Sequence, residues 1–377
     1  MRKLKVTIQP NCKALVYRVT SFDLFPMEWT PDLRFLVLVG TMEERQIVEE
    51  MVGAGVGNVF WVESESLQSG DIVVPDPVRQ ELSVLLRESD AHHALLLTNR
   101  CNSYCLMCSQ PPTRHEDSWL VDEAIEAIMH MRSSPPVIGL SGGEPLLLGA
   151  GLRRVLDALE EHHPATTVEV LSNGRLLADA NVVSEVLQGL RARVRWLVPL
   201  YGHADFVHDF VVQTPGAFDE TLAGLLALQQ HNQEVQLRTV LVEPVLQILP
   251  ELVEFIGRNL PFVSEVALMG CEPIGFALAN RALCEMNLSD WAPTLSQSAR
   301  ILQRHSVPYL FMNAPLCSLP QHLWPKAHRS ISDWKNVYAL ECDDCVVKAD
   351  CCGLFAWHER GWTPAPLKAL QVKERIE

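Results

Sequence analysis

The sequence lacks any apolar run that approaches the roughly 18 residues needed to cross a bilayer. It opens with MRKLKVTIQP, in which no apolar segment follows the basic residues, so we expect no secretory signal peptide. Internal repeats and low-complexity tracts are also absent. Together these absences exclude a membrane-spanning or repeat protein, and they predict a cytoplasmic globular protein without a membrane partner.

Basic residues are scarce relative to acidic ones. The chain has 31 Lys and Arg against 46 Asp and Glu, which gives a formal net charge of −15. Proteins that bind nucleic acid neutralise phosphates with basic side chains, so we expect no nucleic-acid partner. The length of 377 residues fits one barrel domain with smaller additions.

The eleven cysteines are many for a chain that should stay in a reducing compartment. Three lie between residues 101 and 108, and four lie between 342 and 352. The other four stand alone, at Cys12, Cys271, Cys284 and Cys317. Clustered cysteines in such a protein indicate metal or redox chemistry rather than disulfides.

The pattern of residues 1–90 predicts a small α/β unit, which we expect to bind a peptide or a partner protein. Strands are expected over 13–20, 34–38 and 72–74. Thr41 with Glu44 three residues later is a capping-box pattern that predicts a helix. Asp76, followed by Pro77 at a first helical position, predicts a second helix.

From residue 91 to about 285, short apolar segments alternate with longer amphipathic ones. The expected strands are 94–97, 137–141, 168–172, 195–200, 235–242 and 263–269, with helices over 122–132, 152–162, 181–190, 218–231 and 251–259. Repeated βα units imply parallel strands joined by right-handed crossovers. Six units predict an α/β fold, a partial (β/α)6 TIM-like barrel whose sites lie at the carboxyl ends of its strands. Residues 286–377 form a third, Cys-rich region.

The first cysteine cluster follows the first expected barrel strand, in the sequence LLLTNRCNSYCLMCS. Its spacing is C-x3-C-x2-C, through Cys101, Cys105 and Cys108. Thiolates are the usual ligands of iron–sulfur clusters. Three ligands on a four-iron cluster leave one iron open to a cofactor or substrate. A zinc knot or a set of buried thiols is the alternative interpretation.

This loop resembles the signature of the radical S-adenosylmethionine (SAM) superfamily. The resemblance implies a [4Fe-4S] cluster whose open iron binds the amino and carboxylate groups of SAM. It also implies an electron donor, cleavage of SAM to a 5′-deoxyadenosyl radical, and abstraction of a hydrogen atom from the substrate.

The second strand ends in Gly142, Gly143 and Glu144, which resemble the family's motif for the methionine amine of SAM. Glycines let a ligand approach the backbone closely, and a carboxylate accepts from an ammonium. A tight surface turn is the alternative. By the same resemblance, the adenine is expected near Met107.

Two further strand ends carry candidate cofactor contacts. Ser172 and Asn173 are expected to bind the ribose or the carboxylate of SAM, with a plain Asn-Gly turn as the alternative. Arg238 lies inside an apolar strand and needs an anionic partner. That partner is either the SAM carboxylate or a carboxylate of the protein.

The late cysteines follow the pattern Cys342-x2-Cys345-x5-Cys351-Cys352, after the lone Cys317. Part of this pattern resembles the auxiliary-cluster region of peptide-modifying radical SAM enzymes. It implies one auxiliary [4Fe-4S] cluster held by Cys317, Cys342, Cys345 and Cys351, with Cys352 as a substitute for Cys351. Zinc is the alternative metal, because four cysteines with a C-x2-C pair also suit zinc.

Residues Leu97–Pro112, with Pro315–Cys317 and Ser330–Lys335, resemble one of two paired maturases of the His-Xaa-Ser peptide system. The resemblance implies a precursor peptide as substrate and a second radical SAM maturase as partner. Two other functions stay open: a radical SAM enzyme that acts on a small metabolite, and a non-catalytic subunit that transfers electrons or presents peptide. The intact three-cysteine motif with Gly142–Glu144 favours catalysis.

Overall fold

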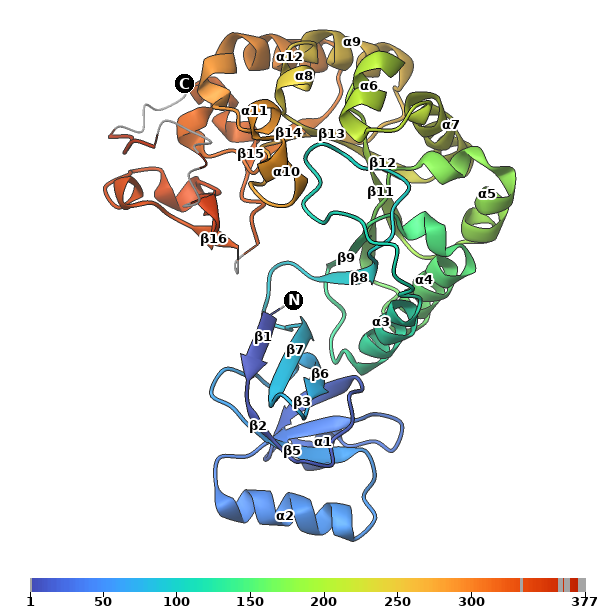
Figure 1. Cartoon of the computed structure of the whole chain (residues 1–377), viewed down its shortest axis with the longest axis vertical. Coiled ribbons are helices and arrows are strands. Elements are labelled where there is room, and N and C mark those ends of the chain that lie inside the picture. The colour runs from blue at the N-terminus through green and yellow to red at the C-terminus, as the bar shows by residue number, and fades with distance from the viewer. Residues whose placement is uncertain (1, 333–334, 359–361, 363–366, 372–377) are drawn as a thin grey trace.

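The computed structural model describes residues 2–332, 335–358, 362 and 367–371. It contains a seven-stranded sheet near the N-terminus, an eight-stranded sheet in the middle of the chain, and a two-stranded sheet near the C-terminus. Figure 1 shows the N-terminal sheet below a crescent formed by the eight-stranded sheet and its helices. Asp333 and Trp334 of the tail motif lie outside the described residues.

The N-terminal unit comprises the seven-stranded sheet and two helices. Its elements are β1 (Arg2–Lys5), β2 (Thr7–Ile8), β3 (Tyr17–Ser21), α1 (Phe25–Glu28), β4 (Phe35–Leu38), α2 (Met42–Gly53), β5 (Val59–Glu63), β6 (Ile72–Asp76) and β7 (Glu81–Leu86). The strand order is β1-β7-β6-β3-β4-β5-β2, in which β3, β4 and β5 are parallel. Thr41 and Glu44 form the expected capping box at the start of α2.

The prediction of a helix after Asp76 is wrong, because the residues after Asp76 form a turn and then strand β7. Asp76 accepts a hydrogen bond from the backbone N–H of Arg79 at 3.1 Å, and Gln80 adopts a φ of 51°. Glu81–Leu86 then alternates between partly exposed and buried side chains, the period of a strand. The side-chain oxygen of Asp76 therefore closes a hairpin turn instead of capping a helix.

The eight-stranded sheet is parallel throughout and has the order β15-β14-β13-β12-β11-β10-β9-β8. Its strands are β8 (Ala94–Thr98), β9 (Val137–Gly142), β10 (Thr167–Leu171), β11 (Val194–Pro199), β12 (Glu234–Val240), β13 (Glu265–Met269), β14 (Tyr309–Met312) and β15 (Ala327–His328). The end strands β8 and β15 do not pair with each other, so the barrel is open and the expected partial TIM-like fold is confirmed. The boundary expected near residue 285 falls between two strands of this sheet, β13 and β14.

Helices cover the outer face of this sheet (Figure 1). They are α3 (Trp119–His130), α4 (Ala150–His162), α5 (Ala180–Leu187), α6 (Asp205–Val212), α7 (Ala217–Gln230), α8 (Glu243–Leu246), α9 (Leu249–Asn259) and α12 (Ala292–Arg304). The short helices α10 (Phe276–Ala279) and α11 (Arg281–Cys284) follow the carboxyl end of β13. Short 3₁₀ helices η1 (Pro145–Leu148) and η2 (Arg175–Ala178) follow β9 and β10. No helix among the described residues is long and apolar enough to cross a membrane.

Apart from α12, β14 and β15, the C-terminal region is built from short elements. These are η3 (Leu288–Trp291), η4 (Leu316–Ser318), η5 (Gln321–Lys326), η6 (Leu340–Cys342), η7 (Lys348–Asp350) and the antiparallel pair β16 (Asn336–Val337) and β17 (Leu354–Phe355). Lys335 forms an ion pair of 3.1 Å with Glu272, which follows β13. This contact fastens the region to the carboxyl end of the barrel sheet.

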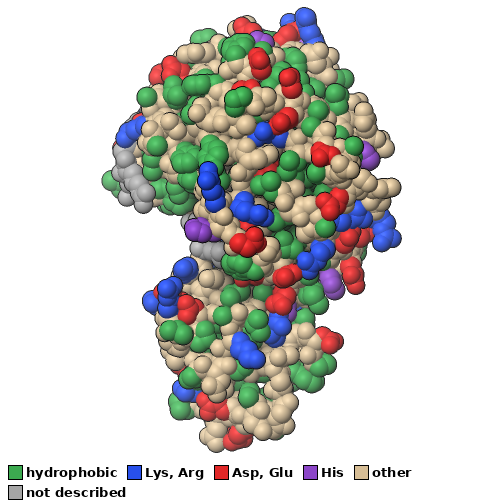
Figure 2. All heavy atoms as spheres, turned by 45° about the vertical axis from the view of Figure 1, so that its right-hand side comes forward, with side chains coloured by type: hydrophobic (Ala, Val, Ile, Leu, Met, Phe, Trp, Pro, Cys, Tyr) green, Lys and Arg blue, Asp and Glu red, His purple; other side chains and the backbone are tan. Residues whose placement is uncertain are grey.

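The N-terminal unit is docked on the end of α3 by three arginines. Arg18 donates to the carbonyl oxygens of His130 and Met131 at 2.6 and 3.3 Å. Arg34 pairs with Glu126 of α3, and Arg132 pairs with Glu28 and Glu88 of the unit. On the face shown in Figure 2, basic side chains are interspersed with acidic ones rather than gathered in a patch.

Apolar packing joins the two parts as well. Val16, Ile72 and Leu86 of the N-terminal unit belong to the same buried cluster as the barrel core. Because α3 has 12 residues, its docked end lies about 18 Å from its first residue. The unit therefore acts as a fixed part of the barrel, attached at the end of α3 opposite its first turn.

We predict that Arg18→Met lowers the free energy of unfolding by about 1.5–3 kcal/mol. The buried guanidinium supplies charged hydrogen bonds to carbonyls at a helix C-terminus, and those carbonyls lose their donor. Urea denaturation measures the change. The control is Arg154→Met, which breaks an exposed ion pair with Asp122 and should cost less than about 1 kcal/mol. Equal midpoints for wild type and Arg18→Met would contradict this account of docking.

Candidate metal and cofactor site

The cysteine loop, residues 99–110, leaves the carboxyl end of β8 and is fastened there by Asp117. This buried carboxylate accepts from the Thr98 hydroxyl at 2.9 Å and from the backbone N–H of Asn99 at 2.5 Å. It also lies 3.4 Å from Nε of Arg100. Asp117 precedes α3 and fixes the direction in which the chain enters Cys101; the sequence analysis did not identify it.

The end of β9 packs directly against this entry. The backbone N–H of Gly143 donates to Thr98 O at 2.9 Å, and that of Glu144 donates to Arg100 O at 2.8 Å. A Cβ at position 143 would collide with the carbonyl of Arg100 and lie 3.1 Å from the Cβ of Cys101. Only glycine permits this approach, so the Gly-Gly-Glu turn forms one wall of the cysteine loop.

Two other segments hold the remaining sides of the loop. The backbone N–H groups of Tyr104 and Leu106 donate to the carbonyls of Val212 and Val211 at the end of α6. On the opposite side, the segment after β13 reaches the third cysteine, where Phe276 N donates to Cys108 O at 2.9 Å. The loop is thus enclosed by the ends of β8 and β9, by α6 and by α10.

The three cysteines are partly buried and interact electrostatically with one another. Burial raises the pKa of Cys101 to about 11 and that of Cys105 to about 12, so the metal-free thiols are protonated near neutral pH. A metal that binds them must displace these protons. Three thiols on one closely packed loop are a donor set that suits an iron–sulfur cluster.

Glu144 is fully buried and joins the ends of β9 and β10. Its carboxylate accepts from the Leu146 N–H at 2.9 Å, the Ser172 hydroxyl at 2.7 Å and the Asn173 N–H at 2.6 Å. Burial raises the pKa of this carboxyl, while these hydrogen bonds lower it. Glu144, from the second strand end, therefore lies beside Ser172 and Asn173, from the third. Gly142 is the last residue of β9 and pairs with Thr98 of β8.

Arg175 binds the cysteine loop directly, and the sequence analysis missed it. Its Nη1 donates to Asn102 O at 2.6 Å and to the Ser103 hydroxyl at 2.9 Å, and its Nε pairs with Glu220 at 2.7 Å. The side chain of Asn173 also donates to Asn102. The signal for Arg175 in the sequence was its position after the Asn173-Gly174 turn, but its partners lie about 70 residues earlier.

Arg238 has a protein partner in this structure. Its Nε donates to Gln236 at 3.0 Å, and its guanidinium lies 3.8 Å from Glu169 of β10. Burial lowers the pKa of Arg238, and Glu169 opposes that shift. The sequence left open whether the anionic partner of Arg238 is the SAM carboxylate or a carboxylate of the protein, and in this structure a protein carboxylate, Glu169, lies beside it. Met107 is buried in the barrel core.

The tail cysteines Cys317, Cys342, Cys345 and Cys351 line one pocket, which we call the tail pocket. Its other walls are largely apolar and are formed by Pro315, Leu316, Tyr338, Val347, Lys348, Gly353, Leu354, Leu367, Lys368 and Leu370. The structure therefore brings together the four cysteines expected to hold the auxiliary metal. An apolar shell of this kind limits solvent access to a metal centre.

Cys351 and its neighbour Cys352 lie in different surroundings. Cys351 lines the tail pocket, and its sulfur accepts from the N–H groups of Leu316 and Gly353 at 3.4 Å each. The neighbouring Cys352 thiol lowers the pKa of Cys351 to about 6, whereas the pKa of Cys352 is raised well above its usual value. Cys352 packs instead with Ile331 and Phe355. Geometry favours Cys351 as the ligand.

Within the described part of the chain, no three His, Cys, Asp or Glu side chains already converge at metal-binding distances. All eleven cysteines belong to that part, and none forms a disulfide. The fold thus gathers the cysteines into two sets, and binding of a metal would bring the sulfur atoms within each set closer together.

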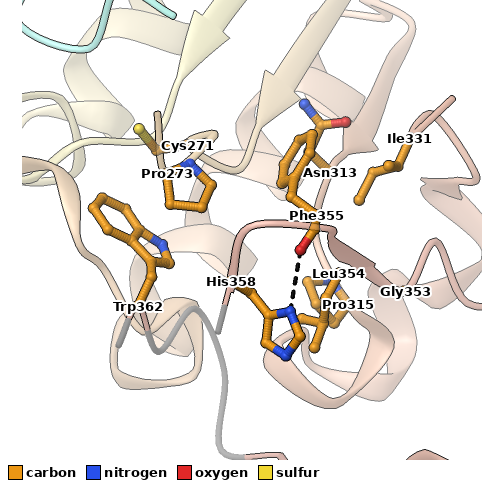
Figure 3. Close-up of a pocket in the computed structure, with 10 residues that line it drawn as sticks. All are labelled: Cys271, Pro273, Asn313, Pro315, Ile331, Gly353, Leu354, Phe355, His358 and Trp362. Carbon is orange, nitrogen blue, oxygen red and sulfur yellow. Dashed lines mark hydrogen bonds between the residues drawn. The ribbon is translucent and has the colours of Figure 1, made fainter. Parts of the chain in front are cut away.

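A second, small pocket lies beside the tail pocket and shares Pro315, Gly353 and Leu354 with it. Figure 3 shows the residues that line it, among them Cys271 and Asn313, which follow β13 and β14, and the C-terminal residues Phe355, His358 and Trp362. His358 contacts Phe355 O at 3.1 Å. The pocket thus lies between the carboxyl end of the barrel sheet and the tail pocket.

Comparison with known proteins identifies the barrel. The family model of the radical SAM superfamily matches residues 95–256. A probable GTP 3′,8-cyclase from Methanocella arvoryzae is 35% identical over 132 residues, which cover 34% of this chain and 40% of that relative. This chain thus matches less than half of the relative's length.

Solved structures show distant likeness. Streptococcus suis SuiB bound to S-adenosylmethionine has 12% identity and a TM-score of 0.48, covering 60% of this chain and 52% of SuiB. A radical SAM methyltransferase from Sphaerobacter thermophilus has 16% identity and a TM-score of 0.42, covering 64% and 68%. Likeness at this level does not bear on substrate. The family match includes the three-cysteine loop, Gly142–Glu144 and β8 to β12, so residues 95–256 of this chain form a radical SAM superfamily domain.

Proposed function

We propose that this radical SAM enzyme cleaves S-adenosylmethionine reductively and modifies a ribosomally made peptide of the His-Xaa-Ser repeat type by hydrogen abstraction. The observation that carries the proposal is the enclosed loop of Cys101, Cys105 and Cys108 at the carboxyl end of the first barrel strand. A [4Fe-4S] cluster with one open iron, together with SAM, would supply the electron and the deoxyadenosyl radical there.

The protein's own part is to bind and orient the cofactor. Gly142 and Gly143 bring backbone close to the loop, and Glu144 is proposed to accept from the SAM ammonium. Ser172 and Asn173 are proposed to bind the ribose or the carboxylate, next to the same Glu144 carboxylate. Arg238 and Met107 are proposed for the SAM carboxylate and the adenine; for Arg238 the competing partner is Glu169.

The tail pocket is proposed to hold an auxiliary [4Fe-4S] cluster on Cys317, Cys342, Cys345 and Cys351. Support comes from the four thiols on one apolar pocket. A cluster ligated by four cysteines has no open iron, so it would transfer electrons rather than bind SAM. Zinc on the same cysteines is the alternative.

A peptide substrate is favoured by the added N-terminal unit and by the four tail cysteines, which line one pocket. The N-terminal unit is proposed to bind a segment of the peptide or the second maturase, remote from the cysteine loop.

A small metabolite is the second candidate substrate, favoured by the similarity to the probable GTP 3′,8-cyclase over 132 residues. A non-catalytic subunit is the third candidate, but electron transfer alone needs no Gly-Gly-Glu wall on the cysteine loop. An electron donor is required in every case. Free cysteines throughout the chain support a cytoplasmic location.

The first prediction concerns SAM cleavage. Anaerobically reconstituted and reduced protein should convert SAM to 5′-deoxyadenosine and methionine. Replacing Cys101, Cys105 and Cys108 together by Ala should abolish this conversion, because no open-iron cluster remains. Liquid chromatography with mass detection measures the products, and adding the precursor peptide shows whether its mass changes. Undiminished 5′-deoxyadenosine from the folded triple variant would sink the proposal; unchanged peptide with active SAM cleavage would leave only the metabolite candidate.

The second prediction concerns the tail metal. The same triple variant should retain about four iron per chain and the visible absorption of a cluster. Cys351→Ala should remove that iron, whereas Cys352→Ala should keep it, because Cys351 lines the tail pocket and Cys352 does not. Metal analysis and absorption spectra measure both. Stoichiometric zinc without iron would overturn the auxiliary cluster, and loss of iron only in Cys352→Ala would overturn the ligand assignment.

The third prediction concerns Glu144. Glu144→Gln removes the charge that is proposed to bind the SAM ammonium. A hydrogen bond between charged groups contributes roughly 1.5–3 kcal/mol, so SAM affinity should fall by about one to two decades. Iron content should stay near wild type, since Glu144 is not a ligand. Equilibrium dialysis measures the affinity.

The control is Glu126→Gln, which removes the charge of a carboxylate that pairs with Arg34 near the end of α3, outside the proposed SAM site. It should leave SAM affinity unchanged. Unchanged SAM affinity in Glu144→Gln would show that the carboxylate acts only by joining β9 to β10.

A further inference from the structure

The charges around the cysteine loop are unevenly distributed. Among the described residues, Arg175 is the buried cation that binds the loop between its first two cysteines, and only 9% of its surface is exposed. Its counterion Glu220, on α7, is about half exposed. The charge of Arg175 is therefore shielded on one side only, by a carboxylate that water also solvates.

Arg175 acts electrostatically on titratable groups from three other segments, namely Glu144, His208 and Cys105. Glu144, at the end of β9, is buried within its electrostatic range. His208 of α6 is also near; burial, helped by the Arg175 charge, lowers its pKa to about 4, so the imidazole is neutral at physiological pH. The Arg175 charge also acts on Cys105, where it opposes the effect of burial.

The position of Arg175 is determined by its backbone. Gly174 adopts a φ of 74°, which turns the chain at the end of β10, and Arg175 N then donates to the Asn173 side chain at 3.1 Å. Asn173 in turn donates to Asn102. These bonds fix the backbone of Arg175 beside the loop, and the guanidinium is held there by its own bonds to Asn102, Ser103 and Glu220.

We propose that Arg175 is a positioning residue that raises the reduction potential of the cluster held by Cys101, Cys105 and Cys108. A cluster gains negative charge when it takes up the electron for SAM cleavage. A fixed positive charge in a partly buried site favours that reduced state. The inference rests on the proposed ligation by these three cysteines.

The test is a redox titration of the reconstituted holoenzyme, followed by electron paramagnetic resonance of the signal that changes when SAM is added. Arg175→Met should make reduction about tenfold less favourable, a potential about 59 mV more negative for one electron. Arg175→Lys keeps the charge and should stay closer to wild type. Glu220→Gln leaves Arg175 in place but removes its counterion, so it should shift the potential in the positive direction.

The control is Arg18→Met, which removes another buried arginine that donates to carbonyl oxygens, but at the far end of α3. It should leave the potential unchanged. If Arg175 acted only by holding the structure, Arg175→Met and Arg175→Lys would shift the potential equally, and Glu220→Gln would not shift it. Either of these results would overturn the inference. Failure of the proposed function looks different, because wild-type protein would then show no SAM-responsive signal at all.

Discussion

The hydrogen bonds that fasten the cysteine loop to the ends of β8, β9 and β10 are the interaction on which the rest of the site depends. Asp117 fixes the backbone that enters Cys101, and Arg175 binds Asn102. The backbone N–H groups of Gly143 and Glu144 donate to the carbonyls of Thr98 and Arg100. Loops on a protein surface are usually mobile. Here buried acceptors and donors restrict this one, so the three cysteines lie on a loop whose path is fixed by the fold.

The same constraint explains why the cofactor candidates lie together. Parallel strands end at one edge of a sheet, and each successive βα connection adds its first residues to that edge. Glu144 uses this proximity to join Ser172 and Asn173, from the neighbouring strand end. The segment after β13 completes the enclosure where Phe276 binds Cys108, and it continues from the pocket wall at Cys271 and Pro273.

Much of the barrel could be predicted because its strands and helices carry strong periodic patterns. The six expected strands match β8 to β13 within a few residues, and the cysteine and glycine motifs lie at strand ends as expected. The short strands β14 and β15 lacked such a pattern. In the N-terminal unit, Asp76 and Pro77 fit the pattern of a helix start. The residues that follow, Glu81–Leu86, alternate between partly exposed and buried side chains and form a strand. Local rules fail where tertiary pairing opposes them.

Asp117 and Arg175 could not be identified in the same way. Each acts on residues brought near by the fold, and neither belongs to a short motif. The choice between Cys351 and Cys352 also needed the structure, because it depends on which side chain faces the tail pocket. Arg238 shows the converse: its need for an anion was predictable, but only the structure shows Glu169 beside it.

The central claim is that the open iron of a cluster on Cys101, Cys105 and Cys108 binds SAM. The most direct measurement is the electron paramagnetic resonance spectrum of the reduced holoenzyme with SAM that carries an isotopic label on its amino nitrogen. The account predicts magnetic coupling between the cluster and that nitrogen, and loss of the coupling in the Cys101, Cys105 and Cys108 triple variant. A reduced cluster that shows no coupling to the label while SAM is bound would contradict it.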